Sequence, residues 1–87
     1  MASVVTNQEH PPGGTARLDA RGLLCPLPVI RTQDKIRTLN VGDVLEVVAT
    51  DPGVLHDIPA WCRVHGHRLL TTERHTGSFY FKIKVTP

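Results

Sequence analysis

The chain is poor in cysteine and in aromatic residues, and the shortage of cysteine bears on its class. Its 87 residues include only two cysteines, Cys25 and Cys62, and 5% aromatic residues. The two cysteines stand far apart and could form only one bridge, whereas secreted mini-domains are usually stabilised by about two to four disulfides. The count argues against a disulfide framework and predicts a reducing compartment.

Long apolar runs and a strong charge are also missing. The first 17 residues hold no apolar stretch longer than Val4-Val5, whereas a signal peptide needs roughly 7 to 15 such residues. No window approaches the roughly 18 apolar residues of a spanning helix. A net charge of +2 is too small for the whole surface to attract nucleic acid. We expect a cytoplasmic protein that neither enters a membrane nor binds nucleic acid directly.

Composition divides the chain into two parts. Residues 1–16 are small, polar and rich in glycine and proline, most densely at Pro11-Pro12-Gly13-Gly14, and predict a disordered N-terminal leader. Residues 17–87 have the length of one small domain.

Hydrophobic patterns predict four strands in this domain, at 17–20, 44–49, 68–75 and 78–85. The segment 44–49 is almost continuously apolar and β-branched, which is typical of a central strand buried on both faces. The last two segments flank Thr76-Gly77 and predict a hairpin, with Phe79 and Phe81 facing the core.

Two helices are expected between the strands. Pro26 and Pro28 are typical of a first helical turn, which makes Cys25 the expected N-cap. The apolar face of this helix is expected to contain Val29, Ile30, Ile36 and Leu39, while Thr32 falls among the polar residues of its other face.

The second helix should begin either at Asp51-Pro52-Gly53 or at Asp57-Ile58-Pro59. We favour Asp57 as its N-cap, because Pro59 deep inside a helix would cost about 3 kcal/mol. Its apolar stripe is expected to contain Ile58, Trp61, Cys62 and His65, and Gly66 can end it. The order βαβαββ predicts an α/β two-layer sandwich, in which a four-stranded mixed sheet carries two helices on one face.

Cys25 is the main candidate for chemistry. A thiol at a helix N-terminus is favoured as thiolate, and its pKa is expected to fall from about 8.5. Pro26 and Pro28 lack N–H groups and shape the pocket, so the nearest free donors should belong to Leu27 and Val29. Position 28 holds no resolving cysteine, which disfavours a dithiol oxidoreductase. A lone activated thiol suits covalent group transfer, and an inert structural cysteine is the alternative.

The remaining candidates have simpler explanations. Cys62 is expected in the core, and a metal site formed with His56, His65 and His67 would have poor ligand spacing, so no metal is expected. Asp51 and Asp57 are expected to form a turn or a helix cap, with orientation of a partner or of the thiol as the alternative.

Basic residues are expected around the cysteine end of the domain. They are either solvated or form a docking surface for an acidic partner. These residues are Arg21, Arg31, Lys35 and Arg37.

The sequence resembles the TusA (SirA-like) sulfur-carrier family from about Leu18 to Lys84. The matching motifs are Leu18-Asp19-Ala20, Gly22-Leu23, Cys25-Pro26-Leu27-Pro28, Gly42, Leu45, Asp51-Pro52, Asp57-Ile58-Pro59, Cys62 and His67. The resemblance makes residues 17–87 a TusA-like domain and implies a βαβαββ sandwich. It also implies that Cys25 accepts sulfur as a persulfide, without a resident cofactor, and relays it to a downstream protein.

In the family, sulfur comes from a cysteine desulfurase or a rhodanese-type enzyme. It goes to proteins of tRNA 2-thiolation, molybdenum-cofactor synthesis or sulfur oxidation. Members that thiolate tRNA carry Arg and Glu where this chain has Leu24 and Leu27, so an apolar rim is expected to select a different partner. We expect a monomer. The competing hypothesis is a non-catalytic regulatory or interaction module in which Cys25 only packs.

Overall fold

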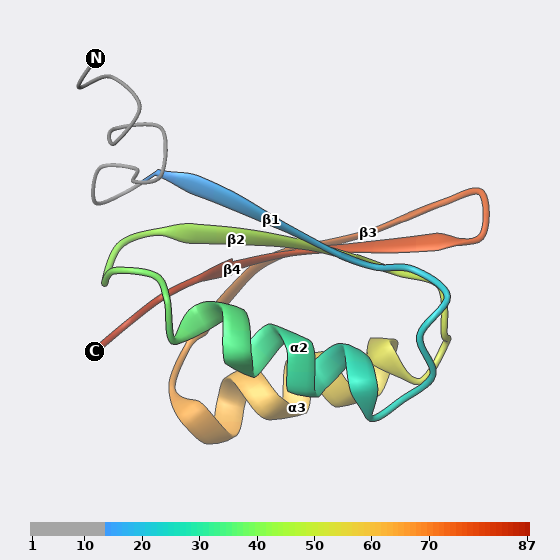
Figure 1. Ribbon diagram of the computed structural model, residues 1–87, viewed down its shortest axis with the longest axis horizontal. Helices are drawn as coiled ribbons and strands as arrows, with labels where there is room; N and C mark the ends of the chain where they lie inside the picture. The colour runs from blue at the N-terminus through green and yellow to red at the C-terminus, as the bar shows by residue number, and fades with distance from the viewer. Residues whose placement is uncertain (1–13) are drawn as a thin grey trace, which may run out of the picture.

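The computed structural model describes residues 14–87, which form two layers (Figure 1). The elements are β1 (Thr15–Ala20), α2 (Leu27–Ile36), β2 (Val44–Ala49), α3 (Val54–His65), β3 (Arg68–His75) and β4 (Ser78–Lys84). Both helices lie on the same side of the sheet (Figure 1). The predicted βαβαββ sandwich is therefore confirmed. No helix among these residues is long and apolar enough to cross a membrane.

The first strand begins earlier than the sequence pattern predicts. Thr15 and Ala16 fall within the predicted leader, yet they pair in parallel with Val44 and Leu45 of β2. Ala16 also packs against the core, and this pairing draws the two residues into the sheet. The rest of the leader prediction, residues 1–13, lies outside the described residues.

The sheet has the strand order β1-β2-β4-β3. β1 runs parallel to β2, while β4 is antiparallel to both β2 and β3. The predicted central position of β2 is confirmed, and Val47 and Val48, which point to opposite faces, are both buried. Because β1 and β2 are parallel, the loops that follow them emerge at the same edge of the sheet.

The core fills the space between the sheet and the helices. Phe81 and Ile83 of β4 are fully buried there, and Phe79 is nearly so, which confirms the predicted alternation. From α3, Val54, Ile58 and Cys62 complete this layer at a spacing of four residues.

The buried face of α2 differs from the predicted one. It contains Pro28, Thr32 and Ile36, whereas Ile30 remains 47% exposed. Thr32 can lie in the core because its hydroxyl donates a hydrogen bond to the Pro28 carbonyl at 2.8 Å, which satisfies its polar group within the helix.

The second helix begins at Val54 rather than after Asp57, so Pro59 lies inside it. Pro59 removes one hydrogen bond from the helix, but full burial of Val54 and Ile58 on either side of the first turn offsets this cost. His65 is exposed rather than part of the apolar stripe. The helix ends at Gly66 with φ 78°, as its glycine predicts.

Candidate functional site

Cys25 lies in the loop between β1 and α2, at the sheet edge where the parallel strands end. The helix begins at Leu27, and Pro26 occupies the N-cap position with no side-chain cap. The prediction that Cys25 is the N-cap is therefore wrong by one residue. The Cys25–Pro26 peptide bond is cis, and the Cys25 side chain is half-buried, beside the core.

The backbone donors expected near the sulfur are already in use. The Leu27 N–H donates to the Leu24 carbonyl at 2.9 Å, and the Val29 N–H donates to the Pro26 carbonyl at 3.0 Å. The prediction of free donors is wrong because the tight turn before α2 bonds these amides locally. Pro28 is buried, whereas Pro26 and Leu27 are exposed beside the thiol.

Asp51, in the loop after β2, holds the backbone at Cys25. Its Oδ2 accepts the Cys25 N–H at 2.7 Å, and its Oδ1 accepts the Gly53 N–H at 3.1 Å. These two backbone hydrogen bonds hold the pKa of the Asp51 carboxyl below its ordinary value. A second link joins the same loops, since the Gly22 N–H donates to the Thr50 hydroxyl at 2.9 Å.

Gly53, the N-cap of α3, packs directly against the sulfur. A Cβ atom at this position would lie 3.2 Å from Cys25 Sγ and 3.6 Å from Asp51 Oδ1. Glycine therefore lets the helix start approach the thiol closely. The motif Asp51-Pro52-Gly53 predicts a turn from the sequence alone, but it does not show that this turn contacts Cys25.

The pKa of the Cys25 thiol is raised to about 11, the opposite of the expected direction. Burial is the largest cause, followed by interaction with the Asp57 carboxyl and then by the charge of Asp51. Burial and negative charge beside a thiol both disfavour the thiolate. This environment therefore favours the protonated thiol at neutral pH.

An apolar rim surrounds the cysteine. Leu24 is 72% exposed and Leu27 is 43% exposed, on either side of Cys25 and Pro26. Ile30, one turn along α2 from Leu27, extends this surface. We call Leu24, Leu27 and Ile30 the apolar rim.

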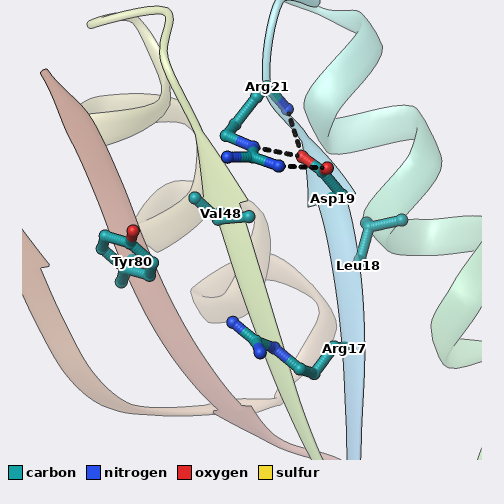
Figure 2. A pocket seen from close by; sticks show the side chains of 6 residues that line it. All are labelled: Arg17, Leu18, Asp19, Arg21, Val48 and Tyr80. Atoms are coloured by element: carbon teal, nitrogen blue, oxygen red, sulfur yellow. Dashed lines mark hydrogen bonds and ion pairs between the residues drawn. The ribbon is translucent and has the colours of Figure 1, made fainter.

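The predicted basic surface is divided between two faces. Arg31 is exposed and Lys35 half-buried on α2, where Arg37 pairs with Asp34 at 3.4 Å. Arg21 instead lies over the open face of the sheet (Figure 2) and forms two side-chain hydrogen bonds with Asp19, at 2.9 and 2.8 Å. Asp19 compensates the charge of Arg21. Arg21 therefore does not extend the positive surface of α2.

Arg21 lines a shallow cavity of about 360 Å³ on the open face of the sheet. Figure 2 shows Arg17 at its other end, with Val48 and Tyr80 between them. Arg17 pairs with Glu46 at 2.9 Å, so each arginine of the cavity already has a carboxylate partner.

Cys62 lies in the core as predicted, with only 2% of its surface exposed. Burial raises the pKa of its thiol to about 11. Both cysteines are free. His67 stacks on Trp61 at 5.3 Å, and its Nδ1 accepts the Thr86 N–H. Across residues 14–87, no three His, Cys, Asp or Glu side chains are grouped to hold a metal ion.

The arrangement agrees with the comparisons with known proteins. The family model described as "Sulfurtransferase TusA" matches residues 16–85, which include nearly the whole fold and the loop of Cys25. The chain belongs to the TusA family. The TusA match begins one residue after the start of β1 and ends one residue after β4.

Individual TusA proteins are similar over most of their length. "Sulfur carrier protein TusA" of Pseudomonas syringae pv. syringae is 44% identical over 69 residues, which cover 79% of this chain and 82% of that protein. "Sulfur carrier protein TusA" of Allochromatium vinosum is 42% identical over 67 residues, covering 77% of this chain and 88% of its own.

Proposed function

We propose that this protein is a sulfur carrier that holds sulfur as a persulfide on Cys25 and passes it to a downstream acceptor protein. The observation that supports this most directly is the placement of Cys25. It is the one thiol of the chain that a partner can reach, since Cys62 is buried in the core. The similarity to proteins named sulfur carriers points to the same chemistry.

Loading is a thiol–persulfide exchange without net oxidation. The Cys25 sulfur attacks the outer sulfur of the donor's persulfide and forms a new S–S bond. The donor's own S–S bond breaks, its electron pair stays on the donor sulfur, and the Cys25 proton balances the charge. Unloading repeats these steps with the acceptor's thiol as the attacking group.

Partners dock on the apolar rim in this proposal. A donor or acceptor sulfur must reach bonding distance of Cys25, so Leu24 and Leu27 necessarily fall within the contact surface. Exposed Arg31 on α2 adds positive charge beside it, which favours an acidic margin on the partner. A cysteine desulfurase or a rhodanese-type enzyme would act as donor, and the acceptor's own surface would decide which thiolation or oxidation pathway is served.

The test is intact mass spectrometry under non-reducing conditions. The protein is incubated with a cysteine desulfurase plus cysteine, and separately with a rhodanese plus thiosulfate. We expect the wild type and Cys62→Ala to gain the mass of one sulfur atom, and Cys25→Ser to gain none. Failure of the folded wild type to gain sulfur from either donor, with Cys25 open to alkylation, would favour a non-catalytic interaction module.

A further inference from the structure

Sulfur exchange at Cys25 requires a proton to leave the thiol and later to return to it. Loading must remove the thiol proton, and unloading must return a proton to Cys25. In a site that disfavours the thiolate, each step needs a group at the sulfur that accepts and then donates this proton.

Two carboxylates contribute to the raised pKa of the thiol, and Asp57 is the less constrained of the two. Both oxygens of Asp51 are engaged by backbone amides, Oδ2 by Cys25 and Oδ1 by Gly53. Asp57 differs, because across residues 14–87 it accepts no hydrogen bond from another residue's backbone and forms no ion pair.

The helix geometry directs Asp57 toward the sulfur. Asp57 follows Gly53 by one turn of α3, and its N–H donates to the Gly53 carbonyl at 3.0 Å. Residues four apart lie on one face of a helix, and helical side chains lean toward the N-terminus. This geometry directs the Asp57 carboxyl toward the end of α3 where Gly53 approaches Cys25 Sγ, which agrees with its contribution to the raised pKa of the thiol.

We propose that Asp57 is a catalytic residue of sulfur transfer, the carboxylate that relays the proton at Cys25. On loading it takes the Cys25 proton and passes it to the departing donor sulfur, and on unloading it takes the proton of the acceptor thiol and passes it to Cys25. This role rests on the proposed carrier function of Cys25. As Cys25 Sγ bonds to the outer sulfur of the donor persulfide, its proton passes to an Asp57 oxygen. The donor leaves as a thiolate, which takes up that proton, so Asp57 ends the step ionised.

The experiment compares two rates on Cys25 in the wild type, Asp57→Asn, Asp57→Glu and Asp34→Asn. The first rate is alkylation by iodoacetamide, which reports the thiolate population. The second is loading by glutathione persulfide, which needs no protein docking. Asp34→Asn is the matched control, because Asp34 is an exposed carboxylate of α2 that pairs with Arg37 at 3.4 Å.

We expect the two rates of Asp57→Asn to move in opposite directions. Loss of the negative charge favours the thiolate, so alkylation at neutral pH accelerates. Loading slows by roughly tenfold, less than the usual contribution of about 10² to 10⁴ from a positioned proton acceptor, because the larger thiolate population compensates in part. Asp57→Glu recovers part of the loading rate, and Asp34→Asn behaves as the wild type in both assays.

Other outcomes would overturn this role. If loading by Asp57→Asn accelerates in step with alkylation, or stays unchanged, Asp57 only suppresses the thiolate and moves no proton. A wild type that gains no sulfur from glutathione persulfide or from either protein donor would instead reject the carrier function itself. Thermal unfolding of each variant establishes that a slow rate is not a loss of fold.

Discussion

The Asp51 carboxylate accepts the backbone N–H of Cys25 at 2.7 Å, across 26 positions of sequence. This bond ties the loop after β2 to the loop after β1, and a second oxygen of the same carboxylate holds Gly53. The cysteine and the start of α3 are thus held by one side chain. The conformation of the site therefore depends on the charge of Asp51.

Stability should fall in acid through Asp51. Its pKa is lower in the folded state, so the folded protein binds fewer protons than the unfolded chain as the pH falls. The stabilisation is complete well above about pH 4, the unfolded value, and is lost as the pH falls through the folded pKa. Urea unfolding of the wild type and Asp51→Asn should show a difference that shrinks on acidification.

That comparison separates Asp51 from Asp19, whose pKa is lowered to about 2 by the hydrogen bonds with Arg21. Asp19 titrates in both proteins and cancels in the difference. A wild-type advantage that stays constant down to low pH would contradict the effect attributed to the Asp51 charge.

Cys25 should alkylate slowly at neutral pH and accelerate well into the alkaline range. With a thiol pKa of about 11, its thiolate fraction at neutral pH lies below that of a free cysteine, whose pKa is about 8.5. The pH profile of iodoacetamide labelling, followed by peptide mass spectrometry, measures this. A midpoint below that of free cysteine would mean that the helix N-terminus outweighs burial and the two carboxylates.

Gly53→Ala should slow reactions at Cys25 without unfolding the protein. Gly53 has helical angles, φ −57° and ψ −24°, so alanine is compatible with the backbone and should change stability by no more than about 1 kcal/mol. The added Cβ would lie 3.2 Å from Cys25 Sγ and crowd the sulfur. Alkylation and loading rates test the effect on Cys25, and thermal unfolding tests the effect on stability. If Gly53→Ala reacts as fast as the wild type, the Cys25 sulfur moves aside freely and the prediction is wrong.

Leu27→Glu should weaken transfer from a protein donor by about tenfold, equivalent to about 1.4 kcal/mol. The glutamate would place a charge at the centre of the apolar rim, while alkylation by a small reagent should change little. Val64→Glu is the matched control, since Val64 is 77% exposed in the last turn of α3, at the opposite end of that helix from Gly53. If Leu27→Glu transfers sulfur as fast as the wild type with every cognate donor and acceptor, the apolar rim is not part of the docking surface.

Cys62→Ala should cost about 1 to 2 kcal/mol of unfolding free energy and leave sulfur loading intact. The side chain is 2% exposed, so its removal leaves a small cavity. Cys62→Ser should cost more, because a buried hydroxyl without a partner carries a penalty of about 1 to 3 kcal/mol. Chemical denaturation and the mass assay test the two effects separately, and a loss of loading in a folded Cys62→Ala would assign this thiol a direct role.

Hydrophobic patterns predicted most of the fold, because the burial of a strand face depends on the spacing of apolar residues within that strand. The apolar run 44–49 predicted a central strand, and alternation around Phe79 and Phe81 predicted the inner face of the hairpin. The predictions failed where a tertiary contact outweighs a local preference. Burial of Val54 and Ile58 allows α3 to include Pro59, and an internal hydrogen bond allows Thr32 to enter the core.

The sequence by itself determined that one cysteine stands between a strand and a proline-rich helix start, and that the order of elements makes a two-layer sandwich. Only the tertiary structure decided the charge of that cysteine. Because β1 and β2 are parallel, the loops after them meet at one sheet edge, and Asp51 and Asp57 come to face a thiol that precedes them by 26 and 32 residues. Spacing along the chain cannot show how deeply the thiol is buried or which charges meet it in space, and burial and charge together favour the protonated thiol.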